Sequence, residues 1–441
     1  MTDTVVIGAG SNELAAAHQL LRAGRSVMVV EERKTDRYTD GWVPPQIAMP
    51  GLAVDQPDPW LRAVLPDGGT LELWRDMKRS TDAIRRLSPR DADKWPRFCE
   101  RMARLAALLA DLYLAPPPSL VDLRFAFKVR RLGRTGMEDL MRVLAMPAAE
   151  LLDDWFENDV LKGALGALAV SDLQQGPRSA GTAFRLLHFH AGNSPGVFRA
   201  PRSNYAQIAR SGLEIRQGVV QRITVRAGQA TGITLDSGEE LGATAVMSGA
   251  DPRRTLVDLT EPGWLDPDLV RALRHIRRRG VAAHIDVELE RAPDWKTLTF
   301  APSLDYVERA YDDAKYRRIS AQPCLDLAAD GTRVHARFQY APYGAEGEIS
   351  PTIVQQHLPA IKRATVRSTM QLEQAFGWPQ GQPHHAELSL DQALWMRPLP
   401  ELAGYGTPIR GLWLCGPAMH PGAGVAGASG YNCARAMLRT L

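Results

Sequence analysis

The first thirty residues of the chain contain three apolar segments with two different spacings. A β-branched run at 4–7 is followed by apolar residues at helical spacing over 14–21, and a third apolar run occupies 27–30. Short continuous apolar runs are typical of buried parallel strands, whereas the middle segment predicts a helix, which Gly24 ends. The order strand, helix, strand predicts a βαβ unit and therefore an α/β fold with a parallel sheet.

A turn that contains two glycines joins the predicted first strand to the helix. Gly8 permits the tight turn that Ala9 continues, and Gly10 has no side chain to keep a pyrophosphate away from the backbone. The helix starts at Ser11 and Asn12, where amide N–H groups and the positive end of the helix dipole attract phosphates. These residues predict a dinucleotide site, and the alternative is a βαβ unit that binds nothing.

Acidic residues stand at three further positions of this unit. Glu31 ends the second strand, 23 residues after Gly8, and can accept hydrogen bonds from ribose hydroxyls, with Glu32 next to it in the same predicted site. Glu13 replaces the third glycine of the usual pattern, which lets helix and strand pack closely. Because a carboxylate near a pyrophosphate is unfavourable, we expect a small cost only if Glu13 faces outward.

The last thirty residues contain a similar arrangement. A buried strand ends in Gly416, and a glycine-rich loop with Gly422, Gly424 and Val425 leads into a helix of small residues over 425–438. A glycine-rich loop at a helix start again favours an anion. Two such loops at opposite ends of one chain fit one large dinucleotide better than two small ligands, and the alternative is a surface glycine loop.

Short predicted strands fill one stretch in the middle of the chain. They lie at 213–216, 219–225, 230–235 and 245–252, with tight turns between them. This spacing predicts a β-meander inserted into the parallel sheet, and we assign Val220 to the cofactor site.

Length and these elements together predict two domains, because 441 residues are too many for one compact core. The segments assigned to a discontinuous Rossmann-type dinucleotide-binding domain are 1–42, 196–252 and 401–441. The segments assigned to an inserted α+β substrate domain are 43–195 and 253–400. In the inserted domain, Ser88 is expected to cap a helix that begins at Pro89.

Three histidines are the candidates for catalysis. His188 and His190 would lie on one face of a strand, and His420 lies in the C-terminal glycine-rich loop. Two imidazoles without further ligands do not make a metal site, so no metal is predicted. No spacing of serine, histidine and acid, or of cysteine and histidine, indicates a nucleophile.

Composition limits the kinds of partner and the cellular compartment that we expect for the protein. A formal net charge of +3 is too small to indicate a nucleic-acid partner. Four widely spaced cysteines suit a reducing compartment, and no apolar run approaches the ~20 residues of a membrane-spanning helix, so we expect a cytoplasmic protein. Residues 123–131 mix aromatic and cationic side chains as a membrane-surface segment does, although helix packing is favoured. Peripheral membrane contact and homo-oligomer formation both stay open.

Motifs spread along nearly the whole chain resemble one family of flavoproteins. They are 6–12, 73–76 with 88–92, 150–157, 392–398, 414–416 and 420–425. On these motifs the chain resembles the phytoene desaturase-like flavoproteins, and among them the branch of pyridine nucleotide-disulfide oxidoreductase domain-containing protein 2. The last motif, from His420 to Val425, is the most specific.

The resemblance implies a fold, a cofactor and a reaction class. It implies FAD, held by a split FAD-binding domain of the glutathione reductase or amine oxidase type. It also implies an FAD-dependent oxidoreductase of the desaturase, dehydrogenase or isomerase type. Such an enzyme would act by hydride transfer on an apolar, carotenoid- or isoprenoid-like substrate that reaches the flavin through an apolar tunnel.

Two segments depart from the family pattern. After Glu31 the stretch 33–42 has one glycine in place of a Gly-Gly pair, and 200–210 is a compressed form of the family's glycine-rich turn and helix. Both lie near the expected cofactor, so the alternative is a non-catalytic binding or assembly subunit with weakened or lost FAD binding. A dehydrogenase that uses only NAD(P) is disfavoured, because it leaves the C-terminal glycine loop unexplained.

Overall fold

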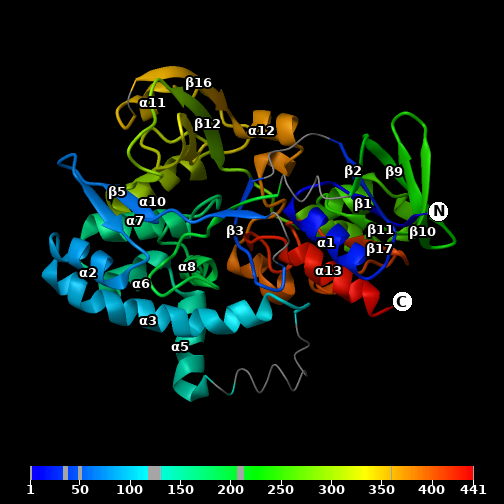
Figure 1. Cartoon of the computed structure of the whole chain (residues 1–441), viewed down its shortest axis with the longest axis horizontal. Helices are drawn as coiled ribbons and strands as arrows, with labels where there is room; N and C mark the ends of the chain where they lie inside the picture. Colours follow the sequence, from blue (N-terminus) through cyan, green and yellow to red (C-terminus); the bar gives the residue numbers. More distant parts are fainter. Residues whose placement is uncertain are drawn as a thin grey trace.

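A computed structural model of the protein describes residues 2–32, 38–47, 52–117, 130, 132–205, 213–358 and 360–440. This part of the chain contains three sheets with helices packed around them (Figure 1). Most of the stretch 123–131 and parts of 33–42 and 200–210 lie outside the described residues. Among the residues that are described, no helix combines the length and the apolar character needed to cross a membrane.

The first sheet contains seven strands in the order β8–β2–β1–β11–β10–β9, with β17 paired to β11. The strands are β1 (Thr2–Ile7), β2 (Val27–Glu31), β8 (Glu214–Gln217), β9 (Val220–Arg226), β10 (Gln229–Leu235), β11 (Glu240–Ser248) and β17 (Leu412–Leu414). The pairs β1–β2, β1–β11, β2–β8 and β11–β17 are parallel, and β9, β10 and β11 are antiparallel. This sheet confirms the predicted βαβ unit and the inserted meander.

Two helices from opposite ends of the chain lie side by side on this sheet. They are α1 (Ser11–Arg22) and α13 (Ala428–Leu438), coloured blue and red in Figure 1. The contact depends on Gly430, because a Cβ there would lie 1.7 Å from the carbonyl oxygen of Asn12. The two glycine-rich loops that precede these helices therefore meet at one edge of the sheet.

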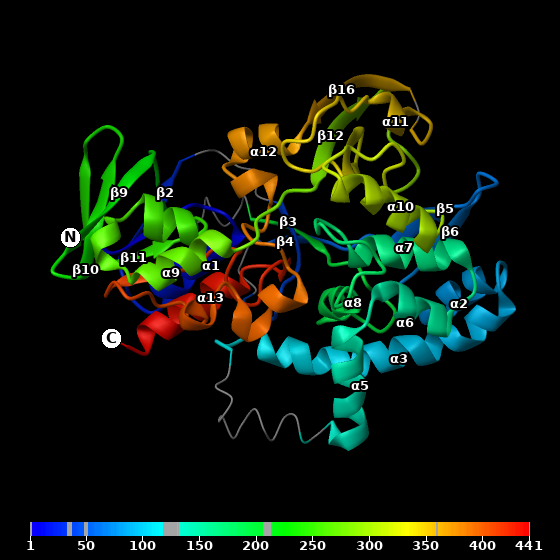
Figure 2. The same ribbon diagram turned by 180° about the vertical axis from the view of Figure 1, so that it is seen from behind.

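One segment assigned to the inserted domain packs instead on the first sheet. It contains the π-helical turn η2 (Arg254–Asp258) and helix α9 (Pro267–His275), which is in the foreground of Figure 2, whereas α1 and α13 are in the foreground of Figure 1. The amide of Ile223 in β9 donates to the carbonyl of Leu259 at 2.7 Å, which ties this segment to the meander. Apolar residues after residue 252, where the sequence predicts a domain boundary, thus pack with the first sheet.

The second sheet has the order β16–β12–β15–β14–β13–β5–β6. Its strands are β5 (Leu61–Val64), β6 (Thr70–Leu73), β12 (Ala282–Leu289), β13 (Thr297–Phe300), β14 (Leu325–Asp330), β15 (Arg333–Gln339) and β16 (Ile361–Arg367). Its apolar face forms a separate core with α11 (Thr352–Gln355) beside it, and its flanking helices are α10 (Leu304–Lys315) and α12 (Thr369–Phe376). The opposite face of this sheet carries polar side chains, several of which line a cavity together with residues of the first sheet.

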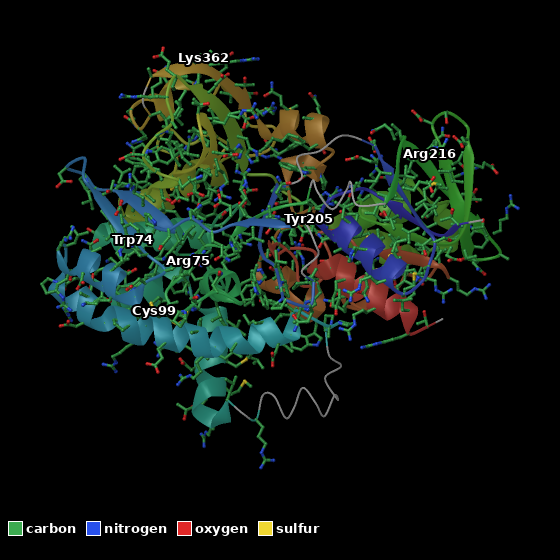
Figure 3. All side chains as sticks on the ribbon, in the orientation of Figure 1. Trp74, Arg75, Cys99, Tyr205, Arg216 and Lys362 are labelled. Carbon is green, nitrogen blue, oxygen red and sulfur yellow. The ribbon has the colours of Figure 1, made fainter. Side chains whose placement is uncertain are left out.

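A helical layer and a small third sheet complete the fold. The helices are α2 (Met77–Arg85), α3 (Pro89–Leu112), α5 (Gly133–Ala145), α6 (Ala148–Trp155), α7 (Asp159–Ala169) and α8 (Ala183–His190). The third sheet, in the order β18–β3–β7–β4, consists of β18 (Gly424–Val425), β3 (Tyr38–Trp42), β7 (Arg202–Asn204) and β4 (Ala53–Asp55). The Ser88 hydroxyl accepts from the amide of Asp91, which confirms the predicted cap of α3. In Figure 3, Tyr205, which follows β7, lies between the two large sheets.

Candidate active site

A cavity of about 950 Å³ begins at the carboxyl ends of β1 and β2 and extends to the polar face of the second sheet. Eleven of the residues predicted to bind the cofactor line it. They are Gly8, Ala9, Gly10, Ser11, Asn12, Glu31, Glu32, Val220, Gly422, Gly424 and Val425. The twelfth, Gly416, does not line the cavity, because it packs on Gly249, whose carbonyl oxygen would lie 2.2 Å from a Cβ at position 416.

The N-terminal end of the cavity has the features that a dinucleotide needs. The amide end of α1 opens into it, and Gly10 leaves the backbone of that turn uncovered. The side-chain Oδ1 of Asn12 is buried and has no hydrogen-bond partner among the described residues. Glu32 on the rim pairs with Arg254 at 3.0 Å. An unsatisfied buried oxygen beside a helix terminus is typical of a site completed by a ligand.

The C-terminal loop is fixed against this end of the cavity by backbone pairing. Gly424 and Val425 form β18, which runs parallel to β3 at Gly41 and Trp42. Gly424 has a φ of +82°, and a Cβ there would lie 2.9 Å from the ring of Phe189. A glycine is therefore required at this position for both conformation and space.

Glu13 faces inward, whereas the sequence predicts a small cost to pyrophosphate binding only if it faces outward. Its side chain is buried under the glycine turn, and its carboxylate would lie 2.6 Å from a Cβ at Gly10 and 2.0 Å from a Cβ at Gly249. Gly10 and Gly249 have no side chains, and this leaves the space that the Glu13 carboxylate occupies. A glycine at position 13 would not need that space. A carboxyl group therefore lies next to the backbone that we expect to face a pyrophosphate.

We predict that Glu13→Gly and Glu13→Gln both tighten FAD binding. Two charges about 4 Å apart repel by ~1 kcal/mol in water and ~4 kcal/mol near a protein surface, and we expect a gain within these limits. Titration of apoprotein with FAD, followed by flavin fluorescence, gives the dissociation constant. Glu138→Gln, an exposed charge removal on α5, is the control. Equal or weaker FAD affinity in both Glu13 variants would show that the carboxylate does not oppose the cofactor.

The three histidines predicted as catalytic candidates do not line the cavity. His188 lies on the helix α8 rather than on a strand, where its Nδ1 is 2.7 Å from the Tyr113 hydroxyl. His190 bonds to the carbonyl of Val197 at 2.7 Å, and His420 to that of Leu112 at 3.2 Å. Burial lowers the pKa of His188 to about 3 and that of His420 to about 4. They are neutral core residues that hold loops in place.

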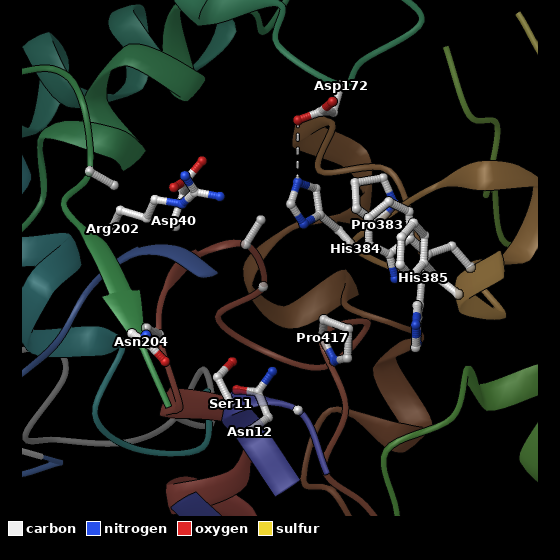
Figure 4. A pocket seen from close by; sticks show the side chains of 18 of the residues that line it. Ser11, Asn12, Asp40, Asp172, Arg202, Asn204, Pro383, His384, His385 and Pro417 are labelled. Carbon is white, nitrogen blue, oxygen red and sulfur yellow. Dashed lines mark ion pairs between the residues drawn. The ribbon is translucent and has the colours of Figure 1, made fainter. Parts of the chain in front are cut away.

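A different histidine lies in the cavity, next to a buried carboxylate. The Nε2 atom of His384 is 3.6 Å from Oδ2 of Asp172, and its side chain keeps 24% of its surface accessible. Arg337 from β15 contacts the same Oδ2 at 3.1 Å. In Figure 4 the imidazole projects into the space between Asp172 and Pro417. The two residues come from segments more than 200 positions apart in the sequence.

Electrostatics keep this pair as a neutral imidazole and a carboxylate. Burial raises the pKa of the Asp172 carboxyl, but Arg337 and His384 outweigh it and hold that pKa well below its usual range. Burial lowers the pKa of His384, and the Asp172 charge offsets this only in part. A neutral His384 that points its Nε2–H at Asp172 leaves Nδ1 free to accept a proton.

Two glutamine side chains hold the backbone of Asp172 in place. Asp172 has a φ of +55°, and its amide donates to Oε1 of Gln339 at 3.1 Å, while Gln382 donates to its carbonyl at 3.0 Å. A non-glycine residue in this conformation costs about 1 kcal/mol or more, so the contacts around it must fix it. Such an outlier beside a cavity is typical of a functional position.

Arg397 joins the His384 segment to the C-terminal glycine loop. It is fully buried, and its guanidinium donates to the carbonyls of Ala386, Glu387, Pro417 and Met419 at 2.8–3.3 Å. Burial lowers its pKa to about 9, so it stays cationic at neutral pH. This residue positions His384 against the loop that we expect to face the flavin.

The substrate end of the cavity is polar rather than an apolar tunnel. Ionisable side chains that line it come from four strands of the second sheet and from the segments beside it. They include Asp172, Arg199, His284, Asp286, Asp326, His335, Arg337, Arg367 and His384. Charged groups in a cavity wall cost desolvation energy unless they meet a polar ligand or one another. The groups of this wall pair with one another, so their burial is compensated, and they also present donors and acceptors that a polar substrate can use.

Comparison with solved structures shows which known fold the chain adopts. The chain aligns over 100% of its length with a putrescine oxidase whose cofactor site was redesigned, covering 99% of that chain, with a TM-score of 0.62 and 14% identity. It aligns with cyclohexylamine oxidase from Brevibacterium oxydans with a TM-score of 0.54 and 13% identity, covering 99% of that chain. The fold is therefore that of the FAD-dependent amine oxidases.

Comparison with curated sequences gives more specific relatives. The chain is 28% identical over its full length to pyridine nucleotide-disulfide oxidoreductase domain-containing protein 2 of Rattus norvegicus, covering 94% of that protein. It is 22% identical over its full length to one of the subunits of limonene dehydrogenase from Castellaniella defragrans, covering 95% of that protein. No model of a known protein family matches the chain. These full-length similarities confirm the resemblance drawn from the motifs.

Proposed function

We propose that the protein is an FAD-dependent dehydrogenase that oxidises a polar substrate at a carbon bearing a hydroxyl or amino group. The observation that carries this proposal is the His384–Asp172 pair, which lines the same cavity as the glycine loops. The cavity size, the glycine turn and the buried Asn12 oxygen support FAD as the cofactor. FAD, when bound, supplies the hydride acceptor.

The residues of this chain would supply the proton chemistry. Oxidation of a C–OH or C–NH group removes a hydride from carbon and a proton from oxygen or nitrogen. His384 would accept that proton at Nδ1, and Asp172 would stabilise the imidazolium that forms. Arg337 keeps Asp172 ionised and in position. A desaturase that acts on a hydrocarbon has no such acidic proton to remove, so the pair favours a dehydrogenase.

The polar lining supports the same choice of substrate. A hydrocarbon-like substrate, such as the carotenoid- or isoprenoid-like class implied by the resemblance or the limonene named in one relative, would make no use of the polar groups of this wall, which pair with one another. The coarser assignment, an FAD-dependent oxidoreductase, does not depend on this choice.

The inward carboxylate of Glu13 supports a second candidate function. If that charge excludes FAD, the protein is a non-catalytic binding or assembly subunit with the same fold. The flavin content of freshly purified protein separates the two, since bound oxidised flavin absorbs near ~450 nm. Protein that neither retains FAD nor binds it on titration would support the second function.

We predict that polar substrates reduce the bound flavin and that hydrocarbons do not. Reconstituted protein is mixed without oxygen with a panel of hydroxy acids, sugar alcohols and amines, and separately with limonene and a carotenoid in detergent. Loss of absorbance near ~450 nm reports reduction. Reduction by at least one alcohol or amine is expected. Reduction by the hydrocarbons alone would overturn the proposed substrate class.

A further inference from the structure

Three adjacent strands of the second sheet present one polar face to the cavity. Residues along β12 alternate between buried apolar side chains and partly accessible polar ones, and the same alternation occurs along β15. The polar members are His284, Asp286 and Glu288 on β12, Arg333, His335 and Arg337 on β15, and Arg363, Thr365 and Arg367 on β16. Because successive side chains of a strand point to opposite faces, these nine share one face.

The strand register arranges these nine residues in three rows. His284 lies opposite both Arg337 and Arg367, Asp286 opposite both His335 and Thr365, and Glu288 opposite both Arg333 and Arg363. Rows two residues apart along a strand are about 6.6 Å apart, so the first and third rows are about 13 Å apart. The first row is the inner one, since Arg337 contacts Asp172.

The third row lies in a groove that continues the cavity outward. The groove, of about 470 Å³, is lined by Glu288, Arg333 and Arg363, which do not line the cavity itself. Six residues line both spaces. They are Arg202, Asp286, Ala328, Asp330, His335 and Arg367. Lys362 lies at the outer end of β16 in Figure 3. A ligand can therefore extend from His384 along the polar face to the groove.

The acidic residues of the two outer rows already have cationic partners. Asp286 contacts both His335, at 2.9 Å, and Arg367. Glu288 contacts Lys362 at 3.3 Å. Arg333 and Arg363 are exposed, and within the described ranges of the chain neither makes an ion pair with an acid. Two guanidinium groups in one groove thus have donors available for an anion.

We propose that Arg333 and Arg363 bind an anionic group of an elongated substrate, a carboxylate or a phosphate, whose other end is oxidised beside His384. The anion site is inferred from the groove, and the oxidation beside His384 rests on the proposed function. The backbone positions of Arg333 and Arg363 lie about 13 Å along the strands from the row that contains Arg337, so the substrate must be elongated. Guanidinium groups match carboxylate and phosphate oxygens in a bidentate way.

Anion binding can be measured without any redox step. Holoprotein is titrated by calorimetry with inorganic phosphate, with acetate and with succinate, at constant ionic strength because exposed charges are screened by salt. The variants are Arg333→Gln, Arg363→Gln and the double variant, with circular dichroism to show that they fold. Arg309→Gln, an exposed arginine of α10 in the same domain, is the matched control.

We expect saturable binding of phosphate or of the carboxylates, weakened at least tenfold in the double variant and unchanged in Arg309→Gln. Binding of phosphate alone assigns a phosphorylated substrate, and binding of acetate or succinate alone assigns a carboxylate. No saturable binding, or equal binding by the double variant and the control, overturns the inference. If anions bind but no alcohol or amine reduces the flavin, the proposed reaction is wrong and the anion site stands. If an alcohol or amine reduces the flavin but no anion binds, the anion site alone is rejected.

Discussion

Replacement of Gly10 by valine is expected to abolish FAD retention while the protein stays folded. Gly10 has a φ of −75°, which a valine adopts without strain, so the backbone of the turn need not change. A valine side chain would occupy the space between the turn and the pyrophosphate and would displace the carboxylate of Glu13, which lies 2.6 Å from the position of a Cβ. Flavin absorbance per mole of purified protein measures the loss.

The control for this prediction is Gly404→Val. Gly404 is exposed, and a Cβ at that position meets no atom within 4 Å. The control should keep the flavin content of the unchanged protein. Flavin retained at full occupancy by Gly10→Val would place the cofactor elsewhere in the cavity and would remove the N-terminal turn from the site.

The sequence predicts the cofactor end of the cavity well because its signals are local. The role of each glycine in the N-terminal turn can be recognised from about ten neighbouring residues, because the strand and the helix around the turn have distinct apolar spacings. The contact between the N-terminal and C-terminal loops follows from the rule that ligands bind at the carboxyl ends of parallel strands. Gly416 packs on Gly249 and does not line the cavity, which the sequence does not reveal because a glycine needed for backbone packing looks the same in sequence as one needed for a ligand.

The substrate end could not be predicted in the same way. Asp172 and His384 meet only through the fold, and neither lies in a recognisable motif. The sequence favours His420 because it lies in a motif, and His188 because it would share a strand face with His190, but both lie in a buried core that the sequence does not reveal. One signal was available, since 283–289 and 333–338 alternate apolar with ionisable residues. That alternation indicates sheet strands with one polar face, although not that this face lines a cavity.

The inward position of Glu13 has the same physical origin. The pattern shows that a glycine is replaced, but the direction of the new side chain depends on the space beside it. That space comes from Gly249, at the end of a strand more than 230 residues away. A local motif therefore predicts the backbone of the turn and leaves the charge next to it undetermined.

Replacement of His384 by glutamine is expected to slow flavin reduction by a factor of ~10²–10⁴, the usual contribution of a general base. FAD occupancy should not change, because His384 lies beyond the glycine loops. The rate of absorbance loss after rapid mixing with a reducing alcohol or amine measures the effect. His275→Gln, at an exposed histidine of α9, is the matched control and should leave the rate unchanged.

The pH dependence of that rate tests whether His384 acts as a base or only shapes the cavity. A base must be neutral to accept a proton, so in the unchanged protein the rate should fall as the pH drops through the pKa of His384, which burial places below its usual value of 6.5. In His384→Gln this acidic limb should disappear. In Asp172→Asn the imidazolium loses the carboxylate that stabilises it, so the pKa of His384 falls further and the limb should move to lower pH. A purely structural role for the pair would lower the rate equally at every pH, and an unmoved acidic limb in both variants would show that the proton leaves by another route.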